Sequence, residues 1–209
     1  DLSKDQWHVV TDLIVERELL PFIDIAYQGF ASDLEEDAYP VRLMFENVPE
    51  MIVASSCSKN FGLYRDRLGA LSIVAKDSAA SVVLRSQVLN IVRTLYSMPP
   101  DHGGAVVSYI LNNADLRHQW LIELNTMRKR LKKMRTLLGV ALREEAPGYN
   151  FSHIERTSGM FCFLGITPLQ VDKLKSEFGI YMVNSSRINI AGITEDNVEH
   201  LATSITAVL

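Results

Sequence analysis

The sequence has 209 residues, of which 47% are hydrophobic and 22% charged, and its formal net charge is -4. A chain of this length forms one large domain or two small ones, and the composition excludes disorder as a description of the whole. The mild acidity provides no positive field for nucleic acid or an anionic membrane, so neither is expected as a partner. Two cysteines cannot build a disulfide framework or a structural zinc site, so no metal is expected and a reducing, cytoplasmic location is predicted.

The first half of the chain shows the alternation of helical and strand patterns that is typical of an α/β layer. Ser3 and Gln6 have the spacing of a capping box, which predicts a helix over residues 3–18. Three apolar runs predict strands, at residues 19–26, 51–55 and 68–75. The first two runs are continuous enough for strands that are covered on both faces of a parallel sheet.

Helical spacing dominates the middle of the chain. It predicts helices at residues 34–45, where Pro40 weakens the pattern, and at residues 84–95, 104–111 and 115–145. The longest one has apolar residues at alternating spacings of four and three, which predicts a single helix docked across a domain, with a coiled coil as the alternative. Its basic cluster at residues 128–133 lies off this seam and is interpreted as a solvated face rather than a nucleic-acid site.

The end of the chain predicts a small α+β unit. After Pro147 and Gly148 the pattern gives strands at residues 159–166, 180–183 and 187–191, and helices that open at Thr167 and Thr194. Thr167 and Gln170 repeat the capping box, with Pro168 at the first helical position. No apolar run approaches the ~18 residues of a membrane span, and no targeting segment is expected.

One short segment carries the clearest chemical signal. Glycine-rich phosphate loops, nucleophile elbows and paired zinc-binding histidines are absent from the sequence. Lys59 follows an apolar strand and precedes a glycine turn, where a partly desolvated amine close to arginines attacks a carbonyl carbon more readily. Schiff-base chemistry at Lys59 is therefore the natural hypothesis, although the Ser-x-Ser-Lys pattern taken by itself is more typical of a polar loop. Ser56, Ser58 and Arg67 offer two hydroxyls and a forked cation, which suit a phosphate dianion.

Asp24 is an acidic residue inside an apolar strand, where a carboxylate is costly unless it meets a cation or a donor. A protonated pyridine nitrogen is such a cation, and in pyridoxal-phosphate enzymes an acidic residue keeps that nitrogen protonated. Tyr27, three residues on, can donate a phenolic hydrogen bond to the other polar edge of the ring. With Lys59, these residues indicate a site for pyridoxal 5'-phosphate.

Four separated motifs occur in order over essentially the whole chain. They are Asp24-Ile25-Ala26-Tyr27-Gln28-Gly29-Phe30, Ser56 to Tyr64 with Arg67, Tyr96-Ser97-Met98-Pro99-Pro100 with His102-Gly103, and Ser186 to Gly192. Together they resemble the aspartate and aromatic-amino-acid aminotransferases, which are class I pyridoxal-phosphate-dependent enzymes of fold type I. The resemblance implies an α/β fold in which residues 1–113 form the carboxy-terminal part of the large cofactor-binding domain, with its mostly parallel sheet. Residues 114–209 would then form the connecting helix and a small α+β domain.

The resemblance also implies roles for the residues around Lys59. Lys59 would form the Schiff base with the cofactor and move the proton between the substrate α-carbon and the cofactor. Asp24 would pair with the pyridine nitrogen, and Tyr27 would hydrogen-bond the phenolic oxygen of the ring. The phosphate would be held by Ser56, Ser58 and Arg67.

Three further residues are implied to bind substrate. Arg187 would bind the α-carboxylate as a forked pair, and Phe161 would line the same pocket. Arg93 would reach into the neighbouring subunit's site to bind a side-chain carboxylate, which implies a homodimer with shared active sites. Without the resemblance, Arg93 reads as a helix-face arginine and Arg187 as a strand-end arginine.

The chain departs from the family pattern in two ways. Met98 stands where the family usually carries a small polar residue, at a position without a catalytic role. Family members are about twice as long, and the match begins partway through the large domain. The chain is therefore expected to be the carboxy-terminal half of a longer protein and to lack a complete site without the missing amino-terminal half.

The predicted function is transfer of an amino group between an amino acid, namely aspartate, glutamate or an aromatic one, and a 2-oxo acid by a ping-pong mechanism. A lyase reaction on the same scaffold is one alternative, because the cofactor supplies the electron sink while the pocket chooses the bond that breaks. A non-catalytic fragment is the other. Arg93 favours transamination because it offers a site for a second carboxylate, but it does not separate aspartate from aromatic substrates.

Overall fold

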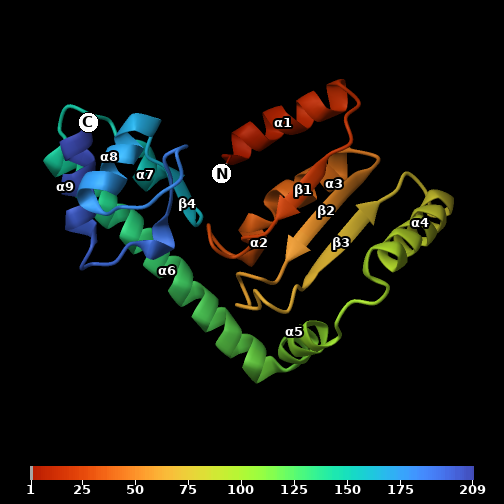
Figure 1. The fold of residues 1–209 in the computed structure, drawn as a ribbon. Helices are drawn as coiled ribbons and strands as arrows, with labels where there is room; N and C mark the ends of the chain where they lie inside the picture. The colour runs from red at the N-terminus through yellow and green to blue at the C-terminus, as the bar shows by residue number, and fades with distance from the viewer. Residues whose placement is uncertain (1) are drawn as a thin grey trace. The chain divides into compact units, whose positions relative to one another are not determined.

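The computed structural model describes residues 2–209 and divides them into two units, residues 2–124 and residues 125–209 (Figure 1). The division falls inside α6 (Ala114–Glu145), whose first turns belong to the first unit and whose remaining turns belong to the second. The assignment of residues 1–113 to a large cofactor-binding domain and of residues 114–209 to a small domain stays a prediction.

The first unit contains a three-stranded sheet in the order β1-β2-β3. Its strands are β1 (Phe22–Ile25), β2 (Met51–Ser56) and β3 (Gly69–Val74), so each apolar run that predicts a strand forms one. β1 and β2 are parallel, whereas β2 and β3 are antiparallel. The sheet within residues 2–124 is therefore mixed rather than wholly parallel.

Helices α1 (Lys4–Glu16) and α3 (Tyr39–Asn47) cover one face of this sheet. Met44 of α3 and Val48, directly after this helix, form a buried cluster with Met51 and Val53 of β2, and Trp7 of α1 packs against it. Apolar residues on alternate positions of a strand share a face, which explains why these strand residues reach the helices together. The sheet and the two helices form the core of the first unit.

The other face of the sheet is open within the described residues. Phe22 of β1 is 67% exposed and Leu71 of β3 is 53% exposed. The expectation that residues 19–26 form a strand covered on both faces is therefore wrong for residues 2–209. The continuous apolar run arises because both faces of β1 carry apolar residues, of which only one face meets a helix here.

Capping explains where several helices begin. At α1 the Ser3 hydroxyl accepts from the Gln6 amide (3.3 Å) and the Gln6 side chain accepts from the Ser3 amide (2.9 Å), which confirms the predicted capping box. The predicted helix over residues 34–45 is instead two helices, α2 (Leu34–Asp37) and α3, because Pro40 occupies the first turn of α3, where its missing N–H is tolerated.

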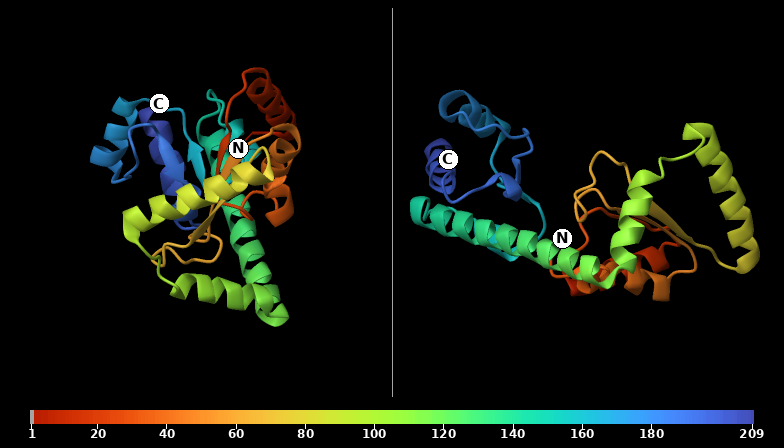
Figure 2. Two further views of the ribbon diagram at one scale, coloured as in Figure 1. Left: turned by 90° about the vertical axis from the view of Figure 1, so that its right-hand side faces the viewer. Right: turned by 90° about the horizontal axis from the view of Figure 1, so that it is seen from below.

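The helices that follow the sheet are α4 (Ser78–Tyr96) and α5 (His102–Asn112). α5 is close to its predicted bounds, whereas α4 begins earlier than predicted because the Asp77 side chain caps it by accepting from the Ala80 amide (2.7 Å). α4 lies on the β3 side of the sheet and α1 on the β1 side (Figures 1 and 2). All nineteen residues of α4 are described, and none of them is buried. Within residues 2–209, no helix combines the length and apolar composition needed to cross a bilayer.

The second unit is built on the later turns of α6. Their predicted apolar seam is buried at Leu131, Met134 and Leu138, while the basic cluster is mostly exposed, as expected. The other elements are α7 (Ser152–Arg156), β4 (Phe161–Phe163), α8 (Pro168–Phe178), β5 (Arg187–Asn189), the 3-10 helix η1 (Ile190–Gly192) and α9 (Val198–Val208). β4 and β5 pair antiparallel, and α8 packs against α9.

Several details of this unit differ from the predictions. The strand predicted at residues 159–166 is shortened to β4, the helix predicted to open at Thr194 begins at Val198, and α7 was not predicted. Residues 180–183 are not a strand, because among the described residues no strand pairs with them and the Ile180 amide instead donates to the Leu174 carbonyl (3.0 Å) at the end of α8. The last predicted strand ends at Asn189, since its side chain accepts from the Ala191 amide (3.0 Å) and caps η1. The capping box of Thr167 and Gln170 at α8 is confirmed.

Candidate active site

Two parallel strands of the first unit end at the segments that carry Asp24 and Lys59. Their register places Asp24 opposite Ala54, two residues before the end of β2. Asp24 is exposed on the open face of the sheet. Because the carboxyl ends of parallel strands meet at one edge, the fold brings a carboxylate-bearing segment and an amine-bearing segment together where open α/β sheets bind ligands.

The backbone around Lys59 is fixed on both sides. The Cys57 amide donates to the Leu68 carbonyl (3.0 Å), and the Ser58 amide donates to the Ser56 hydroxyl (3.1 Å). After Lys59 the Gly62 amide donates back to the Lys59 carbonyl (3.2 Å), with Gly62 at a φ of +68°. Lys59 is therefore held in a tight turn rather than in a free loop.

The ring of Tyr27 is in contact with the amine of Lys59. The Lys59 Nζ lies 4.5 Å from the centroid of the Tyr27 ring, a distance at which an ammonium group is attracted to the ring face. Two residues that are distant in the sequence and were both predicted for the site thus lie together. Both side chains are half-buried, so this contact is partly shielded from water.

A carboxylate missed by the sequence reasoning anchors the loop after Tyr27. Asp37 accepts hydrogen bonds from the amides of Gly29 (2.8 Å), Ala31 (3.0 Å) and Ser32 (2.9 Å). These three donors belong to a loop, where side chains often replace the missing backbone partners. Sequence offered little signal for this role, because Asp37 is one of several acidic residues in the same stretch.

Trp120 of α6 supports the segment just beyond Lys59. Its indole Nε1 donates to the Asn60 carbonyl (2.7 Å), and its ring stacks on Phe61 with centroids 4.3 Å apart and planes 9° apart. The Asn60 side chain is buried and donates to the Gln28 carbonyl (3.4 Å), which links the turn to the loop after Tyr27. The helical pattern identifies Trp120 only as an apolar seam residue, so this contact was also missed.

The predicted phosphate-binding residues occupy the turn and the loop that leads to β3. Ser58 is buried, whereas Arg67 is exposed at a φ of +54° and donates to the Tyr64 carbonyl (2.9 Å). Within residues 2–209, no hydrogen bond joins the Arg67 guanidinium to Ser56 or Ser58. These residues nonetheless fit pyridoxal phosphate: the hydroxyls and the guanidinium suit its phosphate, the amine suits its carbonyl carbon, and the carboxylate suits its pyridine nitrogen.

Arg93 is not brought to Lys59. It lies exposed in the last turn of α4, and its carbonyl accepts from the Ser97 amide (3.1 Å). Ser97 has a φ of +64°, so the chain leaves the helix sharply there. In the described part of the chain, the Arg93 side chain makes no hydrogen bond or ion pair.

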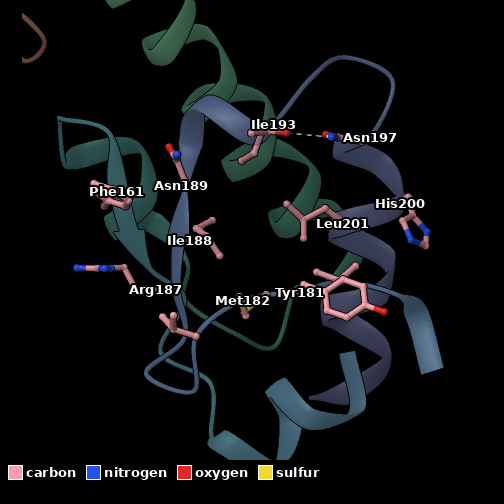
Figure 3. Close-up of a pocket in the computed structure, with 13 residues that line it drawn as sticks. Phe161, Tyr181, Met182, Arg187, Ile188, Asn189, Ile193, Asn197, His200 and Leu201 are labelled. Carbon is pink, nitrogen blue, oxygen red and sulfur yellow. Dashed lines mark hydrogen bonds between the residues drawn. The ribbon is translucent and has the colours of Figure 1, made fainter. Parts of the chain in front are cut away.

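Arg187 and Phe161 lie together in the second unit (Figure 3). The Arg187 guanidinium carbon is 4.8 Å from the centroid of the Phe161 ring. In the β4–β5 pair, Phe161 opposes Asn189 and Phe163 opposes Arg187, so Phe161 and Arg187 are diagonal neighbours on one face. Cation–π contact of this kind orients an arginine while leaving its N–H groups available.

The backbone before Arg187 is also held. Ser186 is buried at a φ of +62°, its hydroxyl accepts from the Gly165 amide (3.1 Å), and its carbonyl accepts from the Leu164 amide (3.0 Å). Beside this strand lies a cavity of about 470 Å³ with mainly apolar lining, including Met182, Ile188 and Leu201. Figure 3 shows Arg187 extending away from the side occupied by Tyr181 and Leu201.

Comparison with known proteins places these residues in a family. The family model for aminotransferases of class I and II matches residues 1–205. An aspartate aminotransferase of Haemophilus influenzae is 49% identical over 209 residues, which are 100% of this chain and 53% of the relative. An aromatic-amino-acid aminotransferase of Pseudomonas aeruginosa is 45% identical over 208 residues, which are 100% of this chain and 52% of the relative.

A solved structure agrees with these relatives. The aromatic-amino-acid aminotransferase from Burkholderia pseudomallei, crystallised covalently bound to pyridoxal phosphate, superposes with a TM-score of 0.95 at 42% identity. The superposition covers 100% of this chain and 52% of that structure, so the chain spans about half the length of the proteins it matches. The chain therefore belongs to the class I and II aminotransferase family, whose members depend on pyridoxal phosphate, and it has their fold type I architecture.

Proposed function

We propose that this chain is the carboxy-terminal half of an aminotransferase that moves an amino group between an amino acid and a 2-oxo acid. The observation that carries the proposal is the Lys59 amine 4.5 Å from the Tyr27 ring, at the sheet edge reached by the strand of Asp24. Relatives named for aspartate and for aromatic amino acids match at similar identity, so both substrate classes are proposed.

The first unit would hold the cofactor, pyridoxal 5'-phosphate. Asp24 would bind the pyridine nitrogen, Tyr27 would donate to the phenolic oxygen, and Ser56, Ser58 and Arg67 would bind the phosphate. The bound cofactor takes up the electron pair released at the substrate α-carbon. Lys59 would attach the cofactor and, once its amine is free, take a proton from the α-carbon and return it as a general base and acid. The turn that holds Lys59 keeps this amine in place for both tasks.

The second unit would bind the substrate acid. Arg187 would pair its two terminal nitrogens with the α-carboxylate, because a planar guanidinium matches a carboxylate in a forked geometry. Phe161 would line the same pocket and support the guanidinium from its ring face. This arrangement supplies the carboxylate recognition that both an amino acid and a 2-oxo acid require.

Arg93 would bind the side-chain carboxylate of a substrate in the neighbouring subunit of a homodimer. Support for the dimer comes from α4, where Arg93 sits beside large apolar side chains that are more than half exposed, including Leu89, Ile91 and Leu95. A cytoplasmic location belongs to the same proposal, based on the cysteine content.

The test uses the full-length protein and its Lys59→Ala variant. Each is incubated with pyridoxal phosphate, reduced with borohydride and mapped by peptide mass spectrometry, and transamination is measured in parallel. We expect a cofactor adduct on Lys59 in the parent, and loss of both the adduct and nearly all transamination in Lys59→Ala. Lys129→Ala, at an exposed position on α6, is the control and should retain both. Activity retained in Lys59→Ala would reject the proposed function.

A further inference from the structure

Arg135 of α6 is a buried arginine that binds backbone carbonyls. It is only 3% exposed. Its Nε and both terminal nitrogens donate hydrogen bonds to four carbonyl oxygens and one hydroxyl. The acceptors are the carbonyls of Ile154 (3.1 Å), Ser158 (3.0 Å), Gly159 (2.9 and 3.3 Å) and Phe161 (2.6 Å), and the hydroxyl of Thr157 (3.0 Å).

These acceptors lie in one continuous segment, from Ile154 in the middle of α7 to Phe161, the first residue of β4. The segment has little regular structure of its own, and Gly159 bends it at a φ of +87°. β4 and β5 form only three register pairs, and a two-stranded sheet of that size is marginal without outside support. The guanidinium of Arg135 supplies that support at the point where the chain enters β4.

The segment ends at the residue that contacts Arg187. Arg135 binds the carbonyl of Phe161, and the ring of Phe161 lies 4.8 Å from the Arg187 guanidinium carbon. A shift of the β4 entrance would move this ring and leave the Arg187 side chain free to adopt other rotamers. Holding a binding side chain in one orientation improves affinity, because less conformational freedom is lost when the ligand binds.

We infer that Arg135 is a positioning residue for substrate binding, which fixes residues 154–161 so that Phe161 orients Arg187 toward a substrate carboxylate. The inference rests on the proposed role of Arg187. The planar fork of Arg135 is needed because its three nitrogens reach acceptors spread over eight residues, whereas a lysine has a single donor nitrogen.

The experiment measures steady-state kinetics of the full-length protein and of its Arg135→Lys variant. We expect KM for both the amino acid and the 2-oxo acid to rise about ten-fold, the loss that one misaligned charge-assisted hydrogen bond produces, while kcat changes by less than about two-fold. A purely structural role would reduce the active fraction, and hence kcat, at unchanged KM. Calorimetric titration with a non-reacting dicarboxylate should show the same weakening of affinity.

Arg143→Met is the matched control. Arg143 lies on the same helix and donates to the Glu155 side chain of α7 (2.6 Å), but it binds none of the backbone carbonyls that Arg135 holds and no residue of β4. The Arg143→Met substitution should leave KM unchanged, because it removes a contact between α6 and α7 but keeps the hydrogen bond from Arg135 to the Phe161 carbonyl. Phe161→Leu leaves the acceptors of Arg135 in place and should raise KM by itself. If Phe161→Leu leaves KM unchanged, Arg135 does not orient Arg187 through the Phe161 ring.

A double-mutant cycle separates this inference from the proposed function. Arg187→Met should raise KM strongly, and adding Arg135→Lys to it should then raise KM no further, because both act on one interaction. An unchanged KM in Arg187→Met would reject the proposed role of Arg187. A raised KM in Arg187→Met with an unchanged KM in Arg135→Lys, or with fully additive effects of the two, would overturn only the positioning role of Arg135.

Discussion

Gly69 illustrates how one residue controls the approach of two strands beside the site. A Cβ added to Gly69 would lie 2.4 Å from the Ser55 carbonyl oxygen, on the strand that leads to Lys59. That oxygen belongs to the backbone and cannot rotate away. We expect Gly69→Ala to lower the free energy of unfolding by about 1–3 kcal/mol, as overpacking does. Denaturant titration of the full-length protein measures this.

Gly104 is the matched control for Gly69. A Cβ there meets only the Leu68 side chain at 4.0 Å, an ordinary contact, and Gly104 lies inside α5. Gly104→Ala should therefore stabilise the protein by roughly 0.5–1 kcal/mol, because alanine loses less backbone freedom in a helix. Equal effects of the two substitutions would contradict the steric explanation.

Cys57 provides a pH-dependent prediction two residues from Lys59. Burial raises the pKa of the Cys57 thiol above its ordinary value. Only the thiolate reacts with an alkylating agent, so at neutral pH Cys57 should be alkylated more slowly than a free cysteine, with its rate rising at higher pH than that of the free amino acid. Alkylation with iodoacetamide across a pH series, followed by peptide mass spectrometry, gives the profile. If the pH midpoint of Cys57 alkylation lies at or below the midpoint for free cysteine, the predicted increase in the pKa of the Cys57 thiol is wrong.

Single residues with distinctive chemistry were the easiest to predict. Asp24 stood out as a charged residue inside an apolar strand and Lys59 as one that follows such a strand, and the resemblance supplied their partners. Asp37 and Arg135 were missed because their partners are backbone groups, which any sequence provides. The remaining signal for Arg135 is its place four residues after Leu131 on a buried helix face, where a charged residue needs buried acceptors.

At the scale of elements, α6 connects its own packing to the site through Trp120. We expect Trp120→Phe to cost about 1 kcal/mol of stability, because it loses the hydrogen bond to the Asn60 carbonyl but keeps an aromatic ring against Phe61. The freed turn should also bind pyridoxal phosphate more weakly, measured as a raised dissociation constant of the full-length protein. An unchanged constant would show that the turn at Lys59 is set by its own hydrogen bonds alone.

The elements were predicted well where local signals agree. Capping boxes placed the starts of α1 and α8 correctly, and strict helical spacing identified α6 almost to its ends. Residues 180–183 were mistaken for a strand because an apolar run does not reveal whether a partner strand exists. The five-residue helix α7 was missed because it has no side-chain cap to mark its start.

At the scale of the molecule, exposed apolar surface gathers on the open face of the sheet and on α4. Phe22 and Leu71 are more than half exposed on the sheet, as are Val82 and Leu95 on the helix. Large apolar side chains that are exposed on one element or one sheet face often mark an interaction site or an aggregation liability. The chain spans about half the length of its relatives, so we propose that the remaining half covers the sheet face and that a second subunit covers α4.

This proposal predicts different behaviour for residues 1–209 alone and for the full-length protein. Alone, the chain should bind a dye that reports exposed apolar surface and should associate in size-exclusion chromatography, because Phe22 and Leu71 are more than half exposed in the part of the chain that the structure describes. Borohydride reduction with pyridoxal phosphate should then label its lysines without preference for Lys59. The full-length protein should bind little dye, elute as a dimer and carry its adduct on Lys59.

The Phe22→Ser variant of the isolated chain separates the sheet face from α4 as the source of the dye signal. It removes apolar surface from a side chain that is 67% exposed, so dye binding should fall with little loss of folded structure by circular dichroism. In the full-length protein the same substitution should instead destabilise, because burying a hydroxyl without a hydrogen-bond partner carries a cost. If the variant is neutral in both forms, Phe22 remains exposed in the complete protein, and the missing half covers a different surface.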